Sequence, residues 1–143
     1  MAARNVRIVI AALAAAGAVG CTFSPITASR IEGAIAPTFA NLVHVQMSWL
    51  GVPPLPASQS GVTARCRRLI DRQAGSGEWT CVLAWRGPDR RLLRDTFELV
   101  VGTDGCYTAT ASAESFGGPM LTAEDGRRVR NVLYAFEGCF DTT

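Results

Sequence analysis

The sequence predicts an α+β fold in which one N-terminal helix packs on an antiparallel sheet of four or five strands. Two observations support this prediction. Apolar residues recur at helical intervals over residues 29–50, whereas from Val62 onward they alternate with a period of two. Short turn signals separate the alternating segments, and short connections favour antiparallel neighbours.

The predicted helix begins at Ser29 and ends near Leu50. Ser29-Arg30-Ile31-Glu32 has the spacing of a capping box, and apolar residues follow on one face. That mostly apolar face comprises Ile31, Ile35, Phe39, Leu42 and Gln46. Pro37 removes an interior hydrogen bond, so the helix either kinks there or has its main part begin at Pro37. Residues 51–61, rich in Pro and Gly, are predicted to form a loop.

Period-two alternation predicts the strands. One strand begins at Val62, and further strands cover residues 79–85, 96–101 and 106–111. The aromatic residues of these strands, Trp79, Trp85 and Phe97, are expected in the core rather than on a sugar-binding surface. The last segment allows two interpretations, a helix over residues 122–136 or a strand from Arg128 to Phe136. We favour the strand, because Gly126 would lie at a cost in the first turns of the helix.

The first 21 residues are typical of a bacterial lipoprotein signal. A short basic segment precedes an apolar run over residues 8–19, and the run ends at Ala18-Val19-Gly20-Cys21, which resembles a lipobox. This pattern predicts a signal peptide over residues 1–20, lipid on Cys21, a tether over 21–28 and a single domain over 29–143. Two alternatives are ordinary cleavage after Ala18 and an uncleaved membrane span. The predicted lipid anchor on Cys21 places the protein on the extracytoplasmic face of the cell membrane.

The five Cys residues also favour the lipoprotein, because lipid on Cys21 leaves an even four for disulfides. Strand parity puts Cys66 and Cys81 on the core side of neighbouring strands, so we predict a disulfide between them. Exclusion then pairs Cys106 with Cys139, which would hold the C-terminal segment on the sheet. The spacings between these Cys residues are too long for a typical zinc site, and we predict no metal and no cofactor.

The charge balance bears on possible partners. All 14 basic residues are Arg, and the 12 that follow the signal match the 12 Asp and Glu residues. Such a neutral domain is not expected to bind nucleic acid. The sequence contains two Arg clusters, Arg65 with Arg67, and Arg90 with Arg91 and Arg94. If the two clusters adjoin in the fold, they form a cationic patch. The patch would contact anionic lipid headgroups or wall polymers, and the alternative is a solvated outer face.

The sequence contains few candidate catalytic residues. The single His, His44, lies within the predicted helix, and no Ser stands in a nucleophile elbow. We therefore expect a non-catalytic lipoprotein that binds another envelope component or an exported protein. The alternative is a small envelope hydrolase or an inhibitor-like module.

Three cysteine motifs resemble those of a group of uncharacterised actinobacterial lipoproteins. They are Trp79-Thr80-Cys81, Asp104-Gly105-Cys106-Tyr107 and Phe136-Glu137-Gly138-Cys139. The resemblance extends from about Ala64 to the end of the chain, and Glu137 stands where the group more often has Asp. It implies the same location and brings no known activity. The order of one helix and then a strand meander is also similar to cystatin-like rolls, which is a likeness of fold alone.

Overall fold

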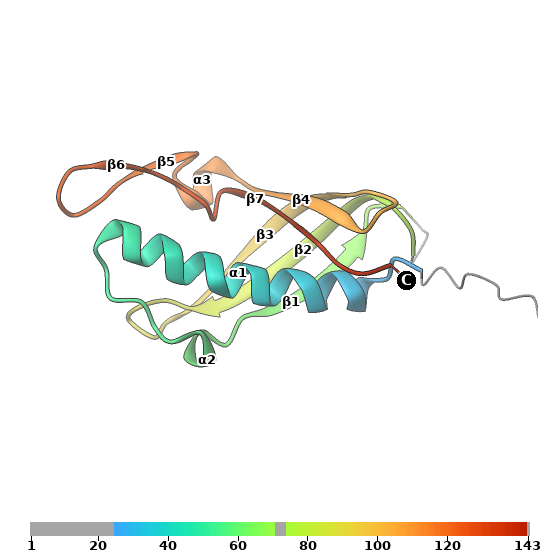
Figure 1. Ribbon diagram of the computed structural model, residues 1–143, viewed down its shortest axis with the longest axis horizontal. Coiled ribbons are helices and arrows are strands. Elements are labelled where there is room, and N and C mark those ends of the chain that lie inside the picture. Colours follow the sequence, from blue (N-terminus) through green and yellow to red (C-terminus); the bar gives the residue numbers. More distant parts are fainter. Residues whose placement is uncertain (1–24, 71–73, 143) are drawn as a thin grey trace, which may run out of the picture.

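The computed structural model describes residues 25–70 and 74–142 (Figure 1). The predicted signal peptide, the predicted lipidation site at Cys21 and the first residues of the predicted tether lie outside the described residues. Helix α1 (Ala28–Leu50) packs against a five-stranded antiparallel sheet, which confirms the predicted fold class. The strands follow the order β1 (Thr63–Arg68), β2 (Gly77–Arg86), β3 (Leu92–Val101), β4 (Cys106–Ala111) and β7 (Ala135–Cys139).

The remaining elements are short. A second, two-stranded sheet pairs β5 (Met120–Thr122) with β6 (Arg128–Arg130), and α3 (Ala113–Phe116) precedes it. The predicted loop over residues 51–61 contains one helical turn, α2 (Ala57–Ser60).

Helix α1 buries one continuous face on the sheet. The buried residues recur every three or four positions: Ile31, Ile35, Phe39, Val43 and Gln46. The helix runs through Pro37 without a break, so a start at Pro37 is wrong. Pro37 and Gly33 both lie at exposed positions, so water can bond the Gly33 carbonyl that lacks its helical donor.

The start of α1 differs from the predicted capping box. The N-cap is Thr27 rather than Ser29, and Glu32 does not turn back to the helix end. Its carboxylate instead accepts the backbone N–H of Cys66 at 2.7 Å. Because β1 is an edge strand, that N–H has no strand partner on its outer side, and Glu32 satisfies it. Helix and sheet are joined by a polar contact that local spacing did not reveal.

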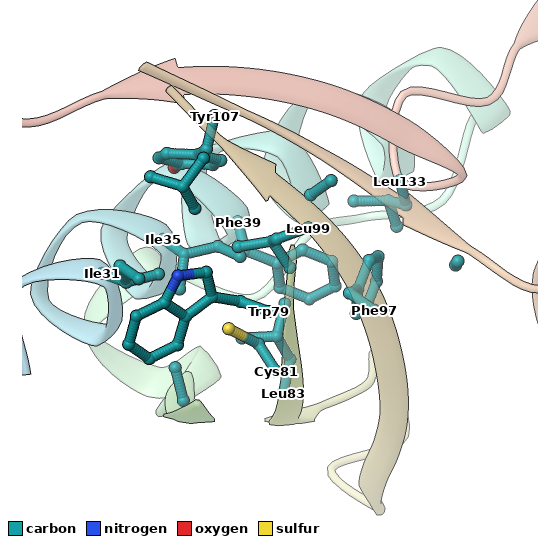
Figure 2. Close-up of a cluster of buried hydrophobic side chains, with 14 of the residues drawn as sticks. Ile31, Ile35, Phe39, Trp79, Cys81, Leu83, Phe97, Leu99, Tyr107 and Leu133 are labelled. Carbon is teal, nitrogen blue, oxygen red and sulfur yellow. The ribbon is translucent and has the colours of Figure 1, made fainter. Parts of the chain in front are cut away.

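The core lies between α1 and the inner face of the sheet. Trp79, Phe39 and Phe97 are among its largest fully buried side chains. The Phe39 ring meets those of Trp85 and Phe97 edge-on, with centroids 4.9 and 5.4 Å apart. Figure 2 shows the side chains of the helix and strands converging there. The aromatic residues predicted for the core are therefore buried, as expected.

Both predicted disulfides are present. Cys66 lies directly opposite Cys81 on neighbouring antiparallel strands, and Cys106 lies opposite Cys139 in the same way. The two bonds differ in their surroundings. Cys81 is completely buried on the inner face, whereas Cys139 is exposed on the outer one.

The C-terminal segment is neither a helix nor one strand from Arg128 to Phe136. The chain leaves β6 at Asn131, turns, and begins β7 at Ala135. The buried Asn131 amide donates to the carbonyls of Phe116 and Gly118 at 2.6 and 2.8 Å. These bonds hold a turn where a continuous strand was predicted, because they satisfy backbone groups across the connection.

Candidate functional site: the basic face of the sheet

The sheet has one face toward α1 and one toward solvent. Along β1 and β2 the inner positions, such as Ala64 and Trp79, are buried, so the alternating positions point outward. On β1 those outward positions carry Arg65 and Arg67, and on β2 the series ends with Arg86. All three Arg side chains are exposed.

The strand register brings a fourth Arg to the same face. Arg94 of β3 lies opposite Ala84, which in turn lies opposite Thr63 of β1. Arg65 lies one outward position further along β1, opposite Val82. Small or uncharged side chains therefore separate the Arg residues.

The hairpin between β2 and β3 adds two more Arg residues at its tip. The turn is closed by bonds from Arg90 N–H to the Gly87 carbonyl and from Gly87 N–H to the Arg91 carbonyl, at 2.9 and 3.0 Å. The Asp89 carboxylate accepts the Arg91 N–H, and the Arg86 guanidinium donates to the Arg90 carbonyl. Among the described residues, only Arg90 is a non-glycine residue with left-handed φ, 62°.

We call this set of six Arg residues the basic face. It consists of Arg65, Arg67, Arg86, Arg90, Arg91 and Arg94. A hollow of about 440 Å³ opens at its hairpin end, where the loop after α1 approaches β2. Leu55, Gln59, Arg86 and Arg90 line it. Two guanidinium-bearing side chains and one amide border one hollow, which suits an oxyanion.

Few carboxylates neutralise the basic face. Arg65 lies 3.7 Å from Glu32, and Arg91 lies 3.9 Å from Asp89. Both Arg side chains are more than 80% exposed, so these pairs contribute little energy. Over residues 25–70 and 74–142, the other four Arg side chains form no ion pair within 4.0 Å. Their charge is available to a ligand.

Acidic residues occupy the other part of the outer face. Glu98 follows Arg94 along β3 and lies opposite Thr80, and Glu137 of β7 lies opposite Thr108. Glu78 of β2 lies opposite Val100, nearer the N-terminal end of α1. Arg86, Arg90, Arg91 and Arg94 therefore lie at or near the β2–β3 hairpin, whereas Arg67 lies in the same row as Glu98.

The structure places Arg65, Arg67 and Arg94 on one face of the sheet and Arg90 and Arg91 in the hairpin next to it, and it adds Arg86 to that face. That residue was missed because it follows the apolar run of β2 and looked like the end of a strand. Its position next to Trp85 was the available signal, because strand parity puts it outward.

Neither His44 nor the buried Tyr107 lies on the basic face. His44 is exposed on α1, and its backbone carbonyl accepts the Ser48 hydroxyl at 3.0 Å. Tyr107 is 2% exposed, and burial raises the pKa of its phenol above the usual value. It packs in the core and not on the basic face.

Two further properties concern metals and membranes. Over residues 25–70 and 74–142, no three His, Cys, Asp or Glu side chains gather closely enough to hold a metal ion. Within the same ranges, no helix has the length and apolar character that crossing a bilayer requires.

Comparison with known proteins adds no relative. No family model matches the chain, and no curated protein or solved structure is significantly similar to it.

Proposed function

We propose that the protein is a non-catalytic lipoprotein of the cell envelope whose basic face binds an anionic envelope polymer. The observation that carries the proposal is the gathering of six Arg residues of a neutral domain on one face and its hairpin. Phosphate and carboxylate groups repeated along a polymer would meet several guanidinium groups at once, and such contacts add up.

The location rests on the N-terminal sequence. Lipid on Cys21 would hold the chain to the extracytoplasmic face of the membrane, as the resemblance to actinobacterial lipoproteins also implies. The two disulfides support an oxidising compartment, because such bonds persist outside the cytoplasm.

The position of the hairpin end of the basic face, with Arg86, Arg90, Arg91 and Arg94, favours a polymer over the lipids of the anchoring membrane. The described chain begins at one end of the molecule, and the β2–β3 hairpin lies at the other (Figure 1). The ten residues of β2 span about 33 Å. Salt at physiological strength screens exposed charges within about 8 Å. The hairpin of an upright domain would therefore not sense the charge of its own membrane.

The proposal can be tested with the soluble chain from Thr22 onward and linear polyphosphate as the probe. We expect binding at low salt that weakens on the order of tenfold as salt rises toward physiological strength. Anionic phosphatidylglycerol vesicles, offered separately, should bind less tightly than the polymer. Tighter binding to vesicles would assign the basic face to lipid headgroups, and binding indifferent to salt would contradict the proposal.

Matched double variants test which Arg residues act. Replacing Arg86 and Arg94 by Gln should weaken polyphosphate binding on the order of tenfold, about 1.4 kcal/mol. Replacing Arg128 and Arg130 by Gln removes the same charge from β6, outside the basic face, and should change binding far less. Equal losses in both variants would show that net charge alone attracts the polymer.

The non-catalytic part of the proposal has its own test. The soluble chain should not hydrolyse generic ester or glycan substrates. Turnover that is lost on His44→Ala would contradict this part and favour the hydrolase alternative.

A further inference from the structure

The described chain begins at the end of the molecule where β1 connects to β2. Thr27 forms an isolated antiparallel bridge with Ala74, and the Gly75 N–H donates to the Ile26 carbonyl at 2.7 Å. Ile26 is itself buried, although the tether was expected to extend to residue 28. The chain therefore leaves the folded domain at Pro25, beside the connection between β1 and β2.

Two large apolar side chains are exposed at this same end. Leu69 and Ile70 follow directly after β1, and they are 59% and 61% exposed. Covering two adjacent apolar side chains that are exposed to this extent with an apolar surface is favourable.

The structure next to the pair is firmly held. The Arg68 guanidinium donates to the carbonyls of Ala74 and Ser76, and it lies over the Trp79 ring, 5.8 Å from the centroid. Trp79 is almost completely buried and donates its indole N–H to the Gly75 carbonyl. The residue before Leu69 is thus fixed to the core.

The length of chain before Pro25 limits how far this end can be from a lipid on Cys21. Three residues lie between Cys21 and Pro25, so four Cα–Cα steps join them, and fully extended these reach at most about 14 Å. The end of the domain that carries Leu69 and Ile70 is therefore kept close to any membrane that holds the lipid.

We propose that Leu69 and Ile70 insert into the surface of the membrane that holds Cys21, as a second contact beside the lipid. This inference rests on the lipid anchor of the proposed function. Two apolar side chains bind a bilayer weakly by themselves, but the anchor makes their contact intramolecular. The contact fixes the orientation of the domain and directs the β2–β3 hairpin away from the bilayer.

The test uses the full chain, produced with its lipid, purified from membranes and reconstituted into vesicles. Leu69→Trp introduces a fluorophore at the proposed contact, and the wild-type emission of the native Trp residues is subtracted. Lipids with brominated acyl chains should quench the added emission at least twofold relative to unbrominated lipids. The matched control is Leu92→Trp, because Leu92 is 64% exposed at the opposite hairpin, and its added emission should not be quenched. Ile70→Trp repeats the test if Leu69→Trp does not fold.

The outcomes separate the two proposals. A wild-type chain that is absent from the membrane fraction contradicts the lipid anchor, and the second contact fails with it. A second outcome would contradict the membrane contact of Leu69 and Ile70 alone. In that outcome the chain binds the membrane and Cys21→Ser releases it, but added Trp residues at positions 69 and 70 are no more quenched than one at position 92.

Discussion

Arg90 adopts a backbone conformation that costs free energy for a residue with a side chain. Its φ of 62° is ordinarily occupied by Gly, because a Cβ atom crowds the following carbonyl there. We expect Arg90→Gly to raise the free energy of unfolding by about 0.5–1 kcal/mol, measured by urea titration. The same variant should bind polyphosphate less tightly, because it loses a guanidinium from the hollow.

The neighbouring residue supplies the control. Arg91 has no left-handed φ, so Arg91→Gly should lower the free energy of unfolding by a similar amount. If both Gly variants shift stability in the same direction, relief of backbone strain at position 90 is not the cause.

Tyr107 links stability to alkaline pH. Burial raises the pKa of its phenol in the folded state above the value near 10 of the unfolded chain. The folded state therefore holds the phenol proton more tightly. The contribution of this protonation to the free energy of unfolding is complete below pH 10 and is lost as the pH rises through the folded pKa. Tyr107→Phe should flatten the fall in unfolding free energy above pH 10. Identical slopes for variant and wild type would contradict this assignment.

At the scale of elements, Gln46 attaches the turn between β6 and β7 to α1. Its amide oxygen accepts the N–H of Val132 at 2.7 Å, and the side chain is completely buried. We expect Gln46→Met, which keeps the volume and removes the acceptor, to lower the free energy of unfolding by about 1–3 kcal/mol. Asn41→Met, at an exposed position of the same helix, should change it by less than about 0.5 kcal/mol in urea titrations.

The two disulfides should differ in their access to a reductant. Cys139 is exposed at the edge strand β7, whereas Cys81 is completely buried. Brief treatment with a phosphine followed by alkylation and peptide mapping should label Cys106 and Cys139 first. Equal labelling of Cys66 and Cys81 would mean that the whole domain opens before either bond is reduced.

Elements whose signals are local were predictable. The alternation of Trp79, Cys81 and Leu83 placed β2, and with the parity of Cys66 on the preceding strand it paired Cys66 with Cys81. Cys106 and Cys139 were then paired by exclusion. The last part of the chain was not predictable in the same way, because Asn131 and Gln46 hold it through contacts with distant residues. The bond from Val132 to Gln46 joins positions 86 residues apart, and no spacing pattern reports it.

At the scale of the whole molecule, the candidate site depends on the register of three strands. Sequence parity alone put Arg65 and Arg67 on an outer face. Only the pairing of β1 with β2 and of β2 with β3 shows that Arg94 lies on the same face. Arg90 and Arg91 join them through the hairpin geometry. A balanced total charge concealed this separation, because composition contains no information on position.

Both ends of the described chain lie at one end of the molecule. Thr27 bridges Ala74 there, and the Phe140 N–H donates to the Gly105 carbonyl beside the C-terminus (Figure 1). A purification tag joined to the C-terminus would therefore hold the domain on a sensor chip from the same side as a lipid on Cys21. Such a chip would present the β2–β3 hairpin to flowing analytes without any bilayer, and a tag inserted in that hairpin would hide it.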